Sequence, residues 1–206
     1  MEIIKGWKDL KVGTYQKLVS AEFNPDDPDG IYEMVGILYG LTKDQVLDLP
    51  LPQTQELIKS LEFLQRKPRP ILVKFEYDLG GTKYEFKAEA SDITTAQYID
   101  FNNTPKEAAK MSELLAVFLV PKGKTYGKGY DFRQVETDIE KYLSVPEALS
   151  MSDFFIYRWR TLLQRTTTAT KRALKAARKD GAITKEQEKE IAGKVQTLAD
   201  MYGSII

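Results

Sequence analysis

The sequence has 206 residues, of which 42% are hydrophobic and 29% charged, so a sizeable core can lie beneath an ordinary charged surface. It contains no cysteine and no histidine, which excludes disulfides, thiolate nucleophiles, zinc sites built on sulfur, and catalytic or metal sites that depend on imidazole. Catalysis by carboxylate, lysine, tyrosine or hydroxyl groups stays open. The formal net charge is zero, so overall charge gives no reason to expect binding to nucleic acid or to a membrane.

The first residues, Met1–Lys5, lack the apolar stretch of a signal peptide. No uninterrupted apolar run approaches the roughly 20 residues that span a bilayer. We therefore expect an intracellular protein with no membrane partner.

The N-terminal third predicts helices. Trp7, Leu10, Tyr15 and Leu18 are spaced as anchors onto a core. Apolar residues recur at helical spacing over 31–41 and again over 53–65. Between these two helices, Thr42 and Gln45 have the spacing of a capping box and predict a short third helix.

The period then changes from helical spacing to alternation. Residues 71–77 and 84–88 alternate between apolar and polar, and Gly80–Gly81 between them is a turn signal. This pattern predicts a β-hairpin with one buried face. Because an isolated two-stranded ribbon is only marginally stable, it must pack on the helices or gain a further strand.

The rest of the chain again predicts helices, with a short one near 92–101. Thr104 to Glu107 reads as a capping box that starts a buried helix running to about Leu119. Asp131 caps the next helix, Ser144 marks another N-terminus, and a long helix runs from Ser152 to about Asp180. Gly181 marks a break, and Thr184 caps a final helix.

These elements predict a mostly helical α+β fold, with a helical body that carries one antiparallel β-hairpin. The domain boundary is expected near residue 150, with a core domain over 1–150 and a C-terminal helical hairpin over 151–206.

Two short motifs suggest ligand binding without completing a site. Lys122-Gly123-Lys124-Thr125 matches the end of a phosphate-binding loop, but Phe118 occupies the position of its first glycine, and the segment before it reads as helix. Asp26, Asp27 and Asp29, and separately residues 180–184, contain parts of a calcium loop without its full ligand set. We therefore predict no catalytic, cofactor-binding or metal-binding residues.

Basic residues are dense over 158–179. One interpretation is a solvated helix face, balanced by Glu186, Glu188 and Glu190 in the next helix. The alternatives are contact with nucleic-acid phosphates or with an acidic protein partner. The residues predicted to bind a partner combine aromatic, apolar and basic side chains: Tyr157, Arg158, Trp159, Arg160, Leu163, Arg165, Lys171 and Arg172.

Residues 31–65 follow a plan that resembles a known protein family. The helix Ile31–Thr42 is followed by Lys43–Leu49, which contains an acidic residue and a Val-Leu pair, and then by a helix ending Ser60–Leu64. This plan resembles the small helical units of tail assembly chaperones of tailed phages. The stretches 93–101 and 116–121 are similar to proteins of phages and prophages in gut Bacteroidetes.

The resemblance implies a non-catalytic phage morphogenesis protein that binds a tail protein during assembly, in the host bacterial cytoplasm. The alternatives are a virion structural protein, such as a connector or tail-completion component, and a nucleic-acid-binding protein that uses the basic helix. A second copy of the chain is a further candidate partner.

Overall fold

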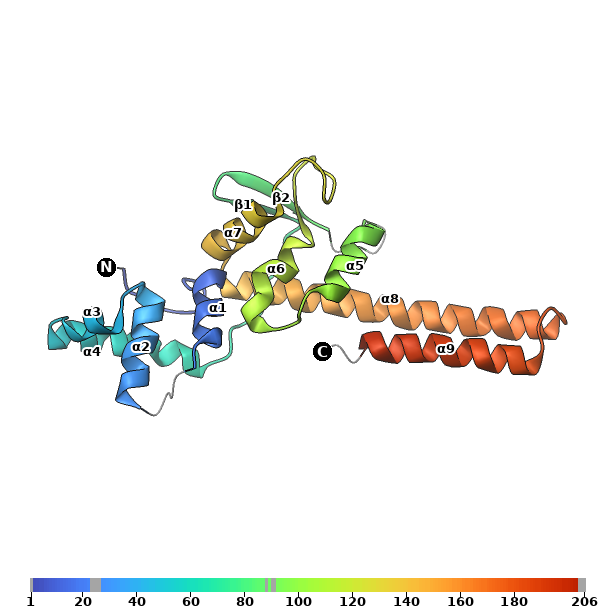
Figure 1. Ribbon diagram of the computed structural model, residues 1–206, viewed down its shortest axis with the longest axis horizontal. Helices are drawn as coiled ribbons and strands as arrows, with labels where there is room; N and C mark the ends of the chain where they lie inside the picture. The colour runs from blue at the N-terminus through green and yellow to red at the C-terminus, as the bar shows by residue number, and fades with distance from the viewer. Residues whose placement is uncertain (1, 23–26, 88, 90–91, 204–206) are drawn as a thin grey trace. The chain divides into compact units, whose positions relative to one another are not determined.

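The computed structural model describes residues 2–22, 27–87, 89 and 92–203. Within helices, the side chains of Pro28, Trp159, Leu162, Leu163 and residues 198–203 lie outside the described part. The chain is mostly helical with one small antiparallel sheet, which confirms the predicted α+β class (Figure 1). It divides into two units, Met1–Lys87 with Ile93–Ser152, and Ala88–Asp92 with Asp153–Ile206.

The first unit begins with a run of helices: α1 (Val12–Ser20), α2 (Pro28–Tyr39), α3 (Lys43–Leu47), α4 (Leu51–Ser60) and the 3-10 helix η1 (Leu61–Gln65). The predicted capping box of α3 is present, because Thr42 and Gln45 each bind the other's backbone N–H. Leu10, Leu18, Leu38 and Val145 form one buried cluster. Val35, Val46 and Leu57 form another between α2, α3 and α4.

The sheet contains the predicted hairpin, with β1 (Glu76–Leu79) antiparallel to β2 (Thr82–Phe86). Gly80 and Gly81 turn the chain with φ of 64° and 90°, values that favour glycine. Tyr77, Leu79, Tyr84 and Phe86 share the buried face. The first strand begins at Glu76 rather than at Ile71, and β2 gains a third strand, β3 (Leu119–Pro121), on its other edge.

The prediction of a helix from Thr104 to Leu119 is wrong. Thr104 ends α5 (Thr95–Asn103), since both its N–H and its hydroxyl donate to the Asp100 carbonyl. The chain then forms η2 (Ala108–Lys110) and the short helix α6 (Met111–Ala116), and it leaves α6 to enter the sheet as β3. An apolar run alone does not distinguish a buried helix from a buried strand, and pairing with β2 decides it here.

Helix α7 (Phe132–Tyr142) packs against α6 and the sheet (Figure 1). Asp131 caps it as predicted, by accepting the Arg133 N–H at 2.9 Å. Val135 and Ile139 are buried on its inner face.

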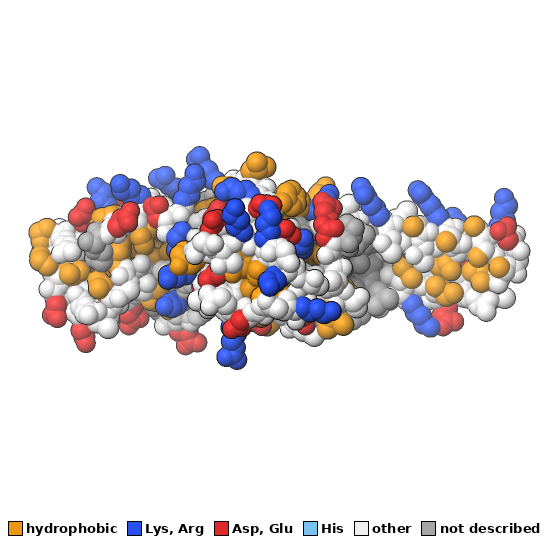
Figure 2. Space-filling model, turned by 90° about the horizontal axis from the view of Figure 1, so that it is seen from above, with side chains coloured by type: hydrophobic (Ala, Val, Ile, Leu, Met, Phe, Trp, Pro, Cys, Tyr) orange, Lys and Arg blue, Asp and Glu red, His pale blue; other side chains and the backbone are white. Residues whose placement is uncertain are grey.

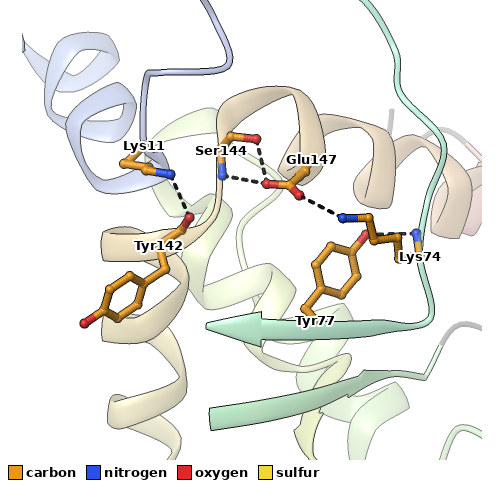
Figure 3. Close-up of polar contacts among 6 residues, drawn as sticks. All are labelled: Lys11, Lys74, Tyr77, Tyr142, Ser144 and Glu147. Carbon is orange, nitrogen blue, oxygen red and sulfur yellow. Dashed lines mark hydrogen bonds and ion pairs between the residues drawn. The ribbon is translucent and has the colours of Figure 1, made fainter. Parts of the chain in front are cut away.

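A single helix, α8 (Val145–Lys179), replaces the two helices expected to start at Ser144 and Ser152. A short antiparallel bridge fixes its start to α1: Val12 donates to the Leu143 carbonyl, and Val145 donates to the Leu10 carbonyl. Figure 3 shows Glu147 at this junction, where it accepts from the Ser144 N–H and hydroxyl and faces Lys74 at 3.9 Å. The boundary between the two units falls within α8, after Ser152.

Candidate interaction surfaces

The second unit is a helical hairpin made of α8 beyond Ser152 and α9 (Lys185–Gly203). At the turn, Gly181 has φ of 77°, and two hydrogen bonds close α8: Gly181 N–H to the Arg178 carbonyl and Ala182 N–H to the Ala177 carbonyl. Thr184 and Gln187 then form the capping box of α9. The predicted break and restart of the helix are therefore both present.

The two helices of the hairpin meet along a thin seam. Lys171 Nζ donates to Gln196 Oε1 at 2.6 Å, and Arg178 pairs with Glu188 at 3.0 Å, which sets an antiparallel register. The half-buried side chains recur at spacings of three and four residues: Thr167, Thr170, Leu174 and Ala177 on α8, and Glu188, Ala192 and Val195 on α9. Among the described side chains of 153–197, only Phe155 is buried, so the described part of the seam supplies little hydrophobic stabilisation.

The predicted partner-binding residues lie on the hairpin and are mostly exposed. Tyr157 is 68% exposed, unusual for so large an aromatic side chain. Arg160, Arg165, Lys171 and Arg172 are exposed as well. Their offsets from Tyr157 are three, eight, fourteen and fifteen residues. At about 100° per residue these offsets place all four within about 80° of Tyr157 around the axis of α8.

The remaining members of the predicted set differ in their surroundings. The Arg158 guanidinium pairs with Glu89 and lies over the Phe154 ring at 5.6 Å from its centroid, so its charge is satisfied within the hairpin unit. Trp159 and Leu163 belong to α8, and their side chains lie outside the described residues. The structure thus leaves four of the eight predicted residues, Tyr157, Arg160, Arg165 and Arg172, on one exposed surface, which we name the hairpin surface. Lys171 is exposed too, but its ammonium is bonded to Gln196 at the seam.

The glycine- and lysine-rich loop over 122–130 follows a strand, β3, so the expectation of a helix before it is wrong. Several of its backbone N–H groups are used within the fold. Lys122 N–H donates to the Lys83 carbonyl, Lys124 N–H to Pro121, and Lys128 N–H to Thr125. Tyr126 fixes the loop further by donating its hydroxyl to Asp100 at 2.7 Å.

The aspartates that resemble part of a calcium-binding loop make contacts at the start of helix α2. Asp27 caps α2 by accepting the Asp29 N–H, and Asp29 pairs with Lys43 at 2.7 Å. Asp26 lies outside the described residues. In the part of the chain that the structure describes, no group of three or more acidic side chains is placed to hold a metal ion.

A second surface, which the sequence did not indicate, lies in the first unit. A groove of about 1050 Å³ runs between residues 3–9, the C-terminal end of α4 with η1, and the extended segment 66–71. We name it the N-terminal groove. Its walls come from segments far apart in the chain, so no local pattern marks it.

The chain matches no protein-family model, no curated protein and no solved structure. Of the helices within the described residues, none has the length and apolar character needed to cross a bilayer.

Proposed function

We propose that this chain works by binding another protein, without catalysis, and that the hairpin surface makes that contact. The observation that carries the proposal is Tyr157, 68% exposed beside Arg160 on a helix that projects basic side chains from one face. Tyrosine and arginine are enriched among the residues that dominate protein interfaces, because each combines a large contact area with directed hydrogen bonds.

The thin seam of the hairpin supports the same proposal. The described side chains of this helical pair bury little apolar surface, and a partner that covers the pair would add stability. Arg160, Arg165 and Arg172 form no ion pair within the described residues, so they remain available to carboxylates of a partner. Charged groups of this kind speed association and select the partner more than they add affinity.

The resemblance of residues 31–65 to tail assembly chaperones supplies the biological setting. We propose that the partner is a phage tail protein, bound during assembly. The alternative with the same surface is a structural component of the virion. Mass spectrometry of purified particles separates the two, because a chaperone is absent from the particle whereas a structural protein is present in stoichiometric amount.

Copurification tests the surface itself. The tagged chain is coexpressed with candidate phage tail proteins, and the variant Tyr157→Ala/Arg160→Ala is compared with Lys17→Ala/Leu47→Ala, which removes one exposed basic and one exposed apolar side chain from the first unit. We expect the hairpin variant to lose the tail protein and the control to retain it. Equal recovery by both variants would overturn the assignment of the hairpin surface.

The basic residues also leave nucleic acid as a competitor for this surface. Binding of the chain to duplex DNA is measured across a salt series, since contacts to phosphates weaken steeply as salt rises. Tight, salt-sensitive binding that Arg165→Ala/Arg172→Ala abolishes would replace the proposed protein partner with nucleic acid.

A further inference from the structure

The N-terminal groove is held open by hydrogen bonds and ring packing along its walls. Trp7 donates its indole N–H to the Arg66 carbonyl at 2.6 Å and packs edge-to-face on Phe63, with ring centroids 5.3 Å apart. Ile4 N–H donates to the Tyr39 hydroxyl, which is 2.7 Å from Ser60 Oγ. A groove with walls tied in this way is formed before any ligand arrives, so binding costs little reorganisation.

The far end of the groove is also fixed. Ile71 N–H donates to Ser150 Oγ at 2.9 Å and ties the segment 66–71 to the start of α8. Pro146, in the first turn of α8, contributes to the lining. Both ends of the groove therefore belong to the packed first unit.

The charge of this groove is unbalanced, although the chain as a whole is neutral. Its basic lining residues are Lys5, Lys8, Lys59, Arg66, Lys67 and Arg69, against the acidic residues Asp9, Glu56 and Glu62. All six basic side chains are exposed, and none forms an ion pair within the described residues. Figure 2 shows Lys and Arg side chains gathered along one edge of the first unit.

The groove lining also contains apolar side chains. Ile3, Ile4, Trp7, Phe63 and Ile71 line it and are half-buried, alongside the exposed basic residues. Partly exposed apolar side chains surrounded by polar ones are typical of a surface that receives a partner. A ligand that fits must therefore carry apolar groups as well as negative charge.

Two features favour a protein segment over nucleic acid. The Trp7 indole N–H is already bonded and its ring packs against Phe63 and Tyr15, so it offers no free platform on which a base could stack. Asp9, Glu56 and Glu62 repel a uniformly charged phosphate backbone, whereas a peptide can place its own basic or neutral residues beside them. We propose that the N-terminal groove binds an acidic segment of a partner protein that has apolar side chains between its carboxylates.

The test is fluorescence anisotropy of the full chain with a labelled peptide in which Asp and Glu alternate with Leu and Phe. The groove variant is Lys59→Gln/Arg66→Gln/Arg69→Gln. Its matched control is Lys17→Gln/Lys124→Gln/Lys128→Gln, which removes the same charge from exposed positions of the first unit outside the groove. All six substituted side chains are exposed, so both variants are expected to keep the fold.

We expect the groove variant to bind the peptide about tenfold more weakly, the effect of three modest charge contacts, and the control to bind like the unmodified chain. Poly-glutamate, which has no apolar groups, should bind more weakly than the mixed peptide. Photo-crosslinking of the mixed peptide should label residues within 3–9 and 56–71. This last measurement reports the location without any variant.

Three outcomes would overturn the proposal: no binding of the mixed peptide by the unmodified chain, equal loss in the two variants, or crosslinks outside the groove. Stronger binding of single-stranded DNA than of the peptide, lost in the groove variant, would instead make this a nucleic-acid groove. The substitutions Tyr157→Ala/Arg160→Ala should leave peptide binding unchanged, so a failure here is distinct from a failure of the hairpin surface.

Discussion

Tyr84 of β2 donates its hydroxyl to Asp138 Oδ2 of α7 at 2.5 Å, and both residues are buried. The other carboxylate oxygen of Asp138 accepts from Gln134 Nε2 at 2.8 Å. This hydrogen bond ties the middle strand of the sheet to the helix that covers it.

Tyr84→Phe should lower the free energy of unfolding by about 1.5–3 kcal/mol, because it removes a hydrogen bond to a buried carboxylate. Tyr126→Phe is the matched control, since Tyr126 also donates to an aspartate, Asp100, but at an exposed position. Its loss should stay under about 1 kcal/mol. Urea unfolding followed by circular dichroism measures both, and equal losses would contradict the structural importance of the buried pair.

The same pair predicts how stability depends on alkaline pH. Burial, and then the adjacent Asp138, raise the pKa of Tyr84 above its ordinary value of 10.0, so the folded state favours the neutral phenol. This contribution is complete below pH 10 and is lost as pH rises above it, because only the unfolded chain then releases the proton.

The unmodified chain should therefore lose its advantage over Tyr84→Phe above pH 10, by about 1.4 kcal/mol per pH unit. Burial also raises the pKa of Tyr77 and Tyr130, but these residues are common to both proteins and cancel in the difference. Unfolding in urea from pH 8 to 11 gives the two curves. A constant gap across this range would show that the environment of Tyr84 does not favour the neutral form.

Local capping signals explain which elements the sequence predicts well. Thr42 and Thr184 each sit three residues before a glutamine, and both start helices as predicted. Thr104 has the same spacing to Glu107 yet ends a helix, because its N–H and hydroxyl are taken by the Asp100 carbonyl one turn earlier. A capping motif marks a helix end, but it does not say whether the helix lies before or after the capping residue. At Thr104 the hydrogen bonds to the Asp100 carbonyl place the helix before it.

The two interaction surfaces also differ in how far the sequence predicts them. The hairpin surface lies on one helix, so the spacing of Tyr157, Arg160 and Arg172 is readable from the sequence. The N-terminal groove unites residues 3–9 with 56–71 and Pro146, and nothing local relates these segments. Likewise β3 exists only because residues 119–121 meet β2, which lies more than thirty residues earlier in the chain.

Substitution by alanine should have opposite effects on stability at two helix glycines, Gly36 and Gly193. At Gly36 in α2, an added Cβ would lie 2.6 Å from the Leu41 carbonyl oxygen, because the chain folds back onto the helix after Gly40. At Gly193 in α9, an added Cβ meets nothing within 4 Å. The backbone contact at Gly36 should outweigh the intrinsic preference of alanine for helices.

We expect Gly36→Ala to destabilise the first unit by about 1–3 kcal/mol and Gly193→Ala to stabilise α9 by about 0.5–1 kcal/mol. Native-state hydrogen exchange measures the two sites separately, as slower exchange in α9 for one variant and faster exchange in α2 for the other. Stabilisation by both substitutions would mean that the Leu41 carbonyl can move away from Gly36 without cost.

The thin seam of the hairpin makes α9 sensitive to its cap. Thr184 Oγ1 accepts from the Gln187 N–H at 3.2 Å, and the Gln187 side chain accepts from the Thr184 N–H at 2.9 Å. Thr184→Ala removes the first of these bonds, which costs about 1 kcal/mol at a helix N-terminus. Because the described side chains of α9 bury little apolar surface, the lost cap should appear mainly as more frequent local opening of α9.

Amide exchange over 185–197 should therefore be about fivefold faster in Thr184→Ala, while the core strands of the first unit exchange at their usual rates. Thr184→Ser is the control, because serine keeps the hydroxyl and should restore slow exchange. Addition of the partner that covers the hairpin surface should slow exchange in the alanine variant as well, since binding stabilises the folded hairpin by mass action. Acceleration that spreads equally through β2 and α7 would show that α9 opens only when the whole chain unfolds.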